Sequence, residues 1–142
     1  MLVKIQNKFI KDAINFLYDM SLKGKKSRHR TRLISLLQEK MKQIGEEEVI
    51  IIKEFAGEDK EGNPKKDDNG NFAINDVKAC QEQLNELWDE FFIIDGGDAH
   101  GMLKTVKEVI EDYDGELSGR QAEVYDHLFD AFEQPEEEKE DE

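Results

Sequence analysis

The residues best suited to chemistry lie near the end of the sequence, where Glu123, His127 and Asp130 are spaced four and three residues apart. On a helix this spacing places the three side chains on one face, because an α-helix repeats every 3.6 residues. With Asp98 or His100 from an earlier glycine-rich segment, they could form a carboxylate–imidazole metal site. The closed zinc motif H-E-x-x-H is absent, so the pattern favours an ordinary helix face over a metal centre.

A second candidate site is the segment KKDDNGNFAIND (65–76), which resembles a calcium-binding loop when Gly70 takes the sixth position. Lys65 would then occupy the first ligand position, and Asp76 would replace the bidentate Glu that normally ends such a loop. A β-hairpin turn at Asn69-Gly70 explains the segment better.

Nucleophilic catalysis has little support either. The single cysteine, Cys80, lies in an apolar helical pattern with no base near it in the sequence. A lone cysteine also excludes an internal disulfide framework. No glycine pattern matches a phosphate-binding loop. We therefore expect a protein that is not an enzyme, with no catalytic residues, no metal and no cofactor.

Charge is the strongest remaining signal. The chain of 142 residues has a formal net charge of -14, and the charge is unevenly spread. Residues 1–53 hold 12 Lys/Arg and 6 Asp/Glu, whereas residues 54–142 hold 8 and 28. Such asymmetry indicates either a charged partner or a match between the two halves of the chain.

The acidic half predicts a partner-binding face. Four acids recur at helical spacing near the end of the sequence, and a second row before them could come from Asp89, Glu90, Glu108, Glu111 and Asp112. Their steps of about 4.5 to 6 Å along a helix are wider than the ~1.7 Å between duplex DNA charges, so one row alone is too sparse to mimic DNA. We expect the partner to be a basic surface on a host or phage protein, bound by Glu123, Asp126, Asp130, Glu133, Glu108, Glu111 and Asp112.

The segment KGKKSRHRTR (23–32) is the opposite feature, with six Lys/Arg and no acid. In one interpretation it neutralises acidic helices of its own chain, which the surplus of acids favours. In the other it grips a nucleic-acid backbone, although no aromatic residue is interleaved for base stacking. The residues concerned are Lys23, Lys25, Lys26, Arg28, Arg30 and Arg32.

Elements that position these residues follow from the apolar periodicity. A strand is predicted at 2–6, then a helix from Asn7, as its N-cap, to Met20, and a long helix from Ser27 to Ala56 that Gly45 could bend. A hairpin is expected near 60–75 and a helix at 76–90. FFIID (91–95) predicts a buried strand, GGDAHG (96–101) a loop, and 102–110 either helix or strand. Ser118 with Gln121 forms a capping-box pattern opening a helix that ends near Glu133.

Three segments together resemble a known family: NKFIKDAINFLYDMSLKGKKSRHRTRLISLLQEK, EFAGEDKEGNP and LSGRQAEVYDHLFDAFE. They look like a family of short, uncharacterised proteins encoded by phages and prophages of Gram-positive bacteria. The resemblance runs from Leu2 to about Glu133, and the long acidic tail departs from it. It implies a phage setting and no known enzyme class.

These observations predict a mainly α (α+β) fold, a single compact domain at 1–133 with four or so helices, a small β-hairpin and short strands. Residues 134–142 are expected to be a disordered acidic tail. No stretch approaches a membrane span, so we expect a location in the host cytoplasm. The predicted function is a phage-encoded binding protein that inhibits a host protein, such as a nucleic-acid-binding or defence enzyme. The alternatives are a virion structural or assembly protein and a nucleic-acid-binding regulator. The oligomeric state is left open.

Overall fold

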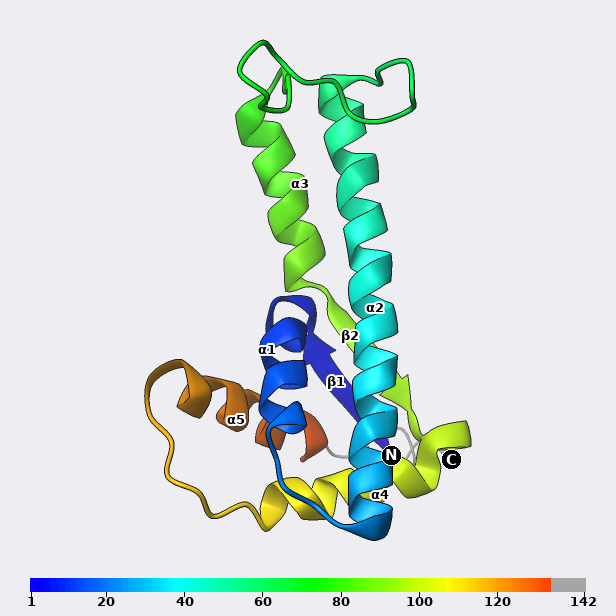
Figure 1. The fold of residues 1–142 in the computed structure, drawn as a ribbon, viewed down its shortest axis with the longest axis vertical. Coiled ribbons are helices and arrows are strands. Elements are labelled where there is room, and N and C mark those ends of the chain that lie inside the picture. Colours follow the sequence, from blue (N-terminus) through cyan, green and yellow to red (C-terminus); the bar gives the residue numbers. More distant parts are fainter. Residues whose placement is uncertain (134–142) are drawn as a thin grey trace, which may run out of the picture.

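The computed structural model describes residues 1–133, apart from the side chains of residues 98–100. Within this range the chain forms five α-helices and one two-stranded antiparallel sheet (Figure 1). The predicted mainly helical class is therefore confirmed, and the acidic tail predicted at 134–142 lies outside the described residues. In chain order the elements are β1 (Leu2–Gln6), α1 (Asn7–Tyr18), α2 (Gly24–Ala56), α3 (Val77–Asp89), β2 (Phe91–Asp95), α4 (Gly96–Glu111) and α5 (Gly119–Phe132).

The sheet joins two segments that lie far apart in the sequence. β1 and β2 pair with Val3 opposite Ile94 and with Ile5 opposite Phe92. Successive side chains of a strand point to opposite faces. Val3, Ile5 and Ile94 are buried, so their face of the sheet is turned towards the core. Both strands were predicted from the sequence at these positions, but FFIID is not the buried strand that was expected, because Phe91 and Ile93 are about half exposed on the outer face of the sheet.

The start of α1 differs from the prediction. Asn7 is not the N-cap but the first residue of the helix, and it is buried. Its side-chain Nδ2 donates a hydrogen bond to the carbonyl oxygen of Leu87 at 2.8 Å. Its backbone N–H donates to the carbonyl oxygen of Glu90, also at 2.8 Å. Asn7 therefore ties α1 to the end of α3, a tertiary role that local spacing could not reveal.

α2 and α3 form a two-helix arm that rises from the base of the molecule (Figure 1). α2 has 33 residues, which corresponds to about 50 Å at 1.5 Å per residue. Its lower half packs against the base, and its upper half runs antiparallel to α3. The helix is continuous through Gly45 and through Val49–Ile52, as the apolar spacing predicted. It begins at Gly24, three residues earlier than the predicted cap at Ser27.

The apolar seam of the arm is narrow. Ile44 from α2 and Cys80 and Leu87 from α3 are buried, which is consistent with the amphipathic pattern of α3. Trp88 is half-buried on the same seam and donates a hydrogen bond from Nε1 to Glu48 Oε2 at 2.8 Å. α3 starts at Val77 with Asp76 as its N-cap, and the Asp76 side chain accepts from the N–H of Ala79.

The tip of the arm, residues 57–76, contains two hairpin turns of the same construction. In the first, the backbone N–H of Asp59 donates to the carbonyl oxygen of Asn63, and the carbonyl oxygen of Asp59 accepts from the N–H of Gly62. In the second, eight residues later, Asp67 does the same with Gly70 and Asn71. Both glycines have φ near +85° (84° and 85°), as expected for three-residue hairpin loops that end in a glycine bulge.

The two turns also share their side-chain hydrogen bonds. Asp59 Oδ1 accepts from two backbone N–H groups of its own turn, and Asp67 Oδ1 does the same in the second turn. The carboxylate of Asp67 is thus a turn-capping group. The expected hairpin at Asn69-Gly70 is present in this form, with one isolated bridge between Lys66 and Phe72.

α4 corrects the prediction of a loop at GGDAHG. The helix starts at Gly96, and the Asp95 side chain caps it by accepting from the N–H of Gly97 at 3.1 Å. Gly96 sits so close to the first residue that a Cβ would lie 2.7 Å from the carbonyl oxygen of Met1. Close packing therefore accounts for this glycine, which propensity alone would assign to a loop.

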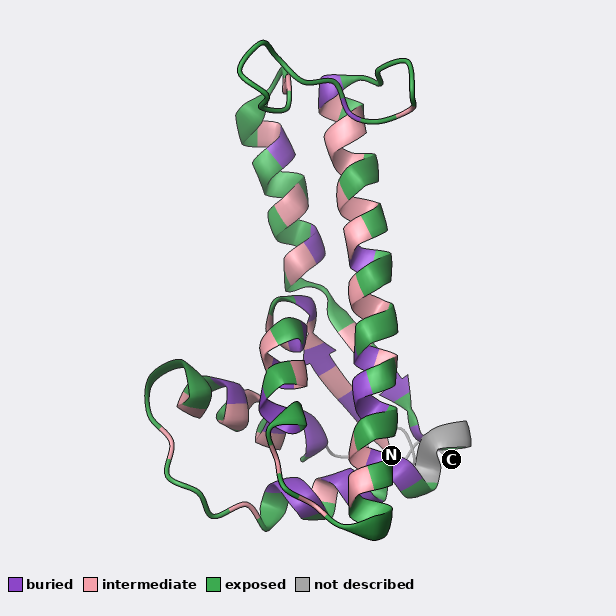
Figure 2. Ribbon diagram, in the orientation of Figure 1, coloured by how far each residue is buried: buried purple, intermediate pink, exposed green. Residues whose placement is uncertain are grey.

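The core lies in the base, where α1, α2, α4 and α5 meet the inner face of the sheet (Figure 2). Figure 2 shows buried residues concentrated there and becoming sparse along the arm. α4 crosses the lower part of the base (Figure 1) and buries Leu103, Val106 and Ile110 completely. The base therefore holds most of the core and carries the candidate charged surfaces.

Candidate functional site

The acidic residues predicted on the last helix lie on α5 and at its C-terminal end. Glu123, Asp126, Asp130 and Glu133 are all exposed. Ser118 is the N-cap of α5, but its side chain makes no capping hydrogen bond, so the predicted capping box does not form. Glu123 contacts Arg120 at 3.2 Å, and Arg120 also contacts Asp12 at 2.8 Å.

The second predicted row lies on the last turn and end of α4. Glu108, Glu111 and Asp112 are exposed there. Glu133 reaches this row: its carboxylate lies 3.7 Å from Lys107 Nζ. A hydrogen bond to Glu133, together with desolvation and the charge of Glu133, raises the pKa of Glu111. The structure therefore brings Glu111 and Glu133 into contact and concentrates negative charge where α4 meets the end of α5.

His127 does not have the environment expected of a metal ligand. Its Nε2 accepts a hydrogen bond from the backbone N–H of Gln6 at 3.2 Å. Its ring stacks on Phe9 with 4.1 Å between ring centroids. Among the described side chains, no group of three His, Cys, Asp or Glu residues could hold a metal ion. The side chains of Asp98 and His100, the other predicted ligands, are not among those that the structure describes.

The packing of His127 makes the stability of the fold depend on pH. Burial is the largest cause that lowers the pKa of His127 below its ordinary value of 6.5, against a smaller opposing effect of Asp130. Burial likewise lowers the pKa of His29. The unfolded chain therefore binds more protons between the lowered pKa values and 6.5, so the free energy of unfolding should fall as pH drops through this window.

Urea unfolding of the wild type and the His127→Gln variant, at about pH 7.5 and about pH 5.5, checks this expectation. Gln does not titrate, so the variant should lose less stability between the two pH values than the wild type. His29 is unchanged in both proteins and supplies the residual slope. An equal loss of stability in the two proteins would contradict the role assigned to His127.

The basic segment 23–32 divides into one structural residue and five free ones. Arg30 Nη1 donates to the carbonyl oxygens of Leu17 and Met20, both at 2.7 Å. These carbonyls close the end of α1, where a positive charge is favourable. Arg30 is therefore a capping residue of the fold, a role that its place in a charge run concealed.

The other five cations form what we call the basic end of α2. All are exposed, and within residues 1–133 none has a carboxylate oxygen within 4.0 Å of its charged nitrogens. The expected neutralisation by acidic helices of the same chain is thus not seen in the described part. The basic end consists of Lys23, Lys25, Lys26, Arg28 and Arg32.

A groove lies beside the basic end of α2, between the end of α1, the end of α4 and the start of α5. Its largest cavity is about 340 Å³ and is bordered by Lys26, Asp19 and Asp112. Two smaller cavities of about 100 and 140 Å³ continue it, and Asp19 borders all three. We call this feature the Asp19 groove. Helical spacing could not predict it, because its walls come from α1, α2, α4, α5 and the segments that connect them.

One wall of the groove depends on the loop after α4. Tyr113 borders two of the cavities and packs edge-on against Phe16, with ring centroids 5.3 Å apart. Gly115 lies against the Tyr113 side chain so closely that a Cβ there would collide with the ring. Tyr125 supports the same corner by donating from its hydroxyl to the carbonyl oxygen of Ile110 at 2.6 Å.

Cys80 is buried, and burial raises the pKa of its thiol. A buried thiol with a raised pKa is protonated at neutral pH and is a poor nucleophile.

In the described part of the chain, none of the helices is both long enough and apolar enough to cross a membrane.

The model of the family described as "Protein of unknown function (DUF1617)" matches residues 1–142. Neither a curated protein nor a solved structure matches the chain.

Proposed function

We propose that this chain, which belongs to the DUF1617 family of proteins of unknown function, is a non-enzymatic binding protein encoded by a phage. It acts in the cytoplasm of the host cell, where its acidic surface binds a basic surface of a host protein and inhibits that protein. The best-fitting targets are nucleic-acid-binding or defence enzymes, because these carry basic channels that an acidic surface can occupy.

The observation that carries the proposal is that exposed acids of α4 and α5 gather where the two helices meet, with Glu133 3.7 Å from Lys107, one turn before Glu111. A hydrogen bond to Glu133 is the largest cause that raises the pKa of Glu111, and desolvation and the charge of Glu133 raise it further. A cationic side chain from a partner would offset the negative charge of this surface. Glu108 and Asp126 lie on the same two helices, are exposed, and have no cation within 4.0 Å among residues 1–133. They are available to a partner without breaking an ion pair of the described fold.

The test is affinity capture from a Gram-positive host lysate, followed by affinity measurement with the purified partner. Reversing Glu108, Glu111 and Asp126 to Lys should weaken binding by about 100-fold or more, because like charges at an interface cost several kcal/mol. Association of the wild type should also slow as salt rises. The matched control reverses Glu46, Glu54 and Glu82, which are exposed on the arm, and should bind normally. Equal loss in both triple variants would mean that net charge rather than this surface drives binding.

A further inference from the structure

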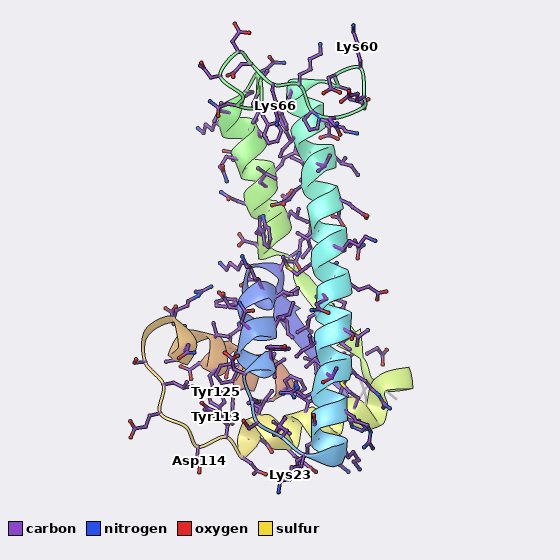
Figure 3. The ribbon with its side chains drawn as sticks, in the orientation of Figure 1. Lys23, Lys60, Lys66, Tyr113, Asp114 and Tyr125 are labelled. Atoms are coloured by element: carbon purple, nitrogen blue, oxygen red, sulfur yellow. The ribbon has the colours of Figure 1, made fainter. Side chains whose placement is uncertain are left out.

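The lower end of the base carries opposite charges side by side. Figure 3 shows Lys23 at the lower end of α2 and Asp114 on the loop after α4, at the same end of the molecule. Lys26, from the basic end of α2, borders the same cavity as Asp19, Asp112 and Asp114. Within residues 1–133, however, no cation of the basic end lies within 4.0 Å of these carboxylates. The charges adjoin but do not pair.

The first turn of α2 is also electrostatically incomplete. Its N-cap is Lys23, which makes no side-chain capping hydrogen bond, and the turn contains no acidic residue. A helix start leaves backbone N–H groups without intrahelical acceptors and carries partial positive charge. The neighbouring cations add to that charge. Carboxylates placed at this end would satisfy both the amide groups and the lysines.

The Asp19 groove offers such carboxylates on an apolar floor. Its main cavity is lined by Met20, Leu22 and Val109 as well as by the three aspartates. Asp19 and Asp114 are exposed and have no cation within 4.0 Å among the described residues. The groove therefore combines apolar contact area with negative charge, which suits the positively charged end of a helix.

We propose that the lower end of the base is an interface between two copies of this chain, related by a two-fold axis. The basic end of α2 of each copy enters the Asp19 groove of the other. A two-fold interface needs a self-complementary surface, in which the residues that one copy offers are those that the other receives. Adjacent, unpaired and opposite charges on one face meet this requirement.

A second copy fits this face better than a nucleic acid does. The phosphate backbone of a duplex would meet the basic end, but the neighbouring aspartates would repel it. Each exposed ion pair contributes only about 0–1 kcal/mol, so the apolar floor must supply part of the affinity. The dimer is therefore weak and sensitive to salt, and it does not depend on the acidic-surface function proposed above.

Sedimentation of the full chain over a range of concentrations tests the proposal. At about 50 mM salt the mean mass should rise with concentration towards twice the chain mass of 16.5 kDa. At about 1 M salt the dimer dissociation constant should be at least about 10-fold higher, because exposed charges are then screened. A wild type that stays monomeric up to about 1 mM at low salt would overturn the proposal.

A charge-swap experiment locates the interface. The basic-reversed variant carries Lys23→Glu and Lys25→Glu, and the acid-reversed variant carries Asp19→Lys and Asp114→Lys. Each alone should weaken the dimer at least about 10-fold through like-charge contacts. An equal mixture of the two should form a mixed dimer as readily as the wild type does. Both variants should fold. Lys23→Glu and Lys25→Glu place negative charge at the start of α2, and Asp19→Lys places positive charge at the end of α1. Both changes are favourable to the helix dipole.

The matched control is Lys60→Glu with Lys78→Glu, which changes the net charge equally at the far end of the arm and should leave the dimer unaffected. If a reversed variant fails to fold, its neutral counterpart with Gln or Asn replaces it and should weaken the dimer less strongly. A dimer that survives in both reversed variants, or a mixture that fails to restore it, would overturn the proposed interface. So would a monomeric wild type that binds a duplex of about 20 base pairs through the basic end.

Discussion

Replacing Phe132 with alanine is expected to lower the free energy of unfolding by about 3–5 kcal/mol. Phe132 is 2% exposed and is among the largest fully buried side chains in the described chain. It lies on the last turn of α5 and belongs to the core cluster shared with β1 and α4. Truncation would remove its apolar contacts and leave a cavity that the neighbouring helices can fill only in part.

Urea unfolding of Phe132→Ala and Phe132→Leu measures this effect. The leucine variant retains most of the apolar volume and should lose clearly less stability than the alanine variant. The exposed neighbour Glu133 provides a control, because Glu133→Ala removes a surface ion pair worth at most about 1 kcal/mol. A loss below about 1 kcal/mol for Phe132→Ala would mean that α5 does not pack on the base as described.

Trp88→Ala is expected to cost slightly less, about 2–4 kcal/mol, because the side chain is only half-buried. Two contributions are lost together. The indole ring packs against the core cluster where the arm joins the base. Its Nε1–H also donates to Glu48 Oε2 at 2.8 Å, a bond that links α3 to α2.

Two single variants separate these contributions in chemical denaturation. Trp88→Phe keeps most of the packing but loses the donor, and it should cost about 1–2 kcal/mol. Glu48→Gln keeps an acceptor oxygen without the charge and should cost less than Trp88→Phe. Stability unchanged in Trp88→Ala, with the fold retained, would indicate that the ring serves as a contact residue for a partner.

Much of the fold could be predicted because the decisive signals were local. The amphipathic pattern from Val77 to Trp88 predicted α3, although Asp76, expected as the start of the helix, is its N-cap. Apolar spacing also carried α2 through Val49–Ile52, although these residues have strong strand propensity. Predictions failed where a tertiary contact overrode a local preference. Gly96 packs too closely against Met1 for a larger side chain, and Asn7 is buried where Leu87 and Glu90 accept its hydrogen bonds.

The same contrast between local signals and tertiary contacts applies to the charged surfaces. Helical spacing correctly placed Asp126 and Asp130 on the exposed side of α5. It could not reveal that Arg120 bridges to Asp12, 108 residues away, or that Glu133 folds back onto Lys107 and Glu111. The tandem turns at the tip did have a sequence signal, since D-x-x-G-N recurs after eight residues at Asp59 and Asp67.

The arm gives this small protein two regions of unequal resistance to opening. Near the base, α2 is held by several layers of buried side chains, whereas beyond Ile44 it is held only by the narrow seam with α3. Segments with few buried contacts open at lower free energy than the global transition. The distal amides should therefore exchange with solvent ahead of those around Leu33 and Leu37. The arm can unfold from its tip while the base stays folded, so one chain contains a stable base and a helical pair that unfolds separately.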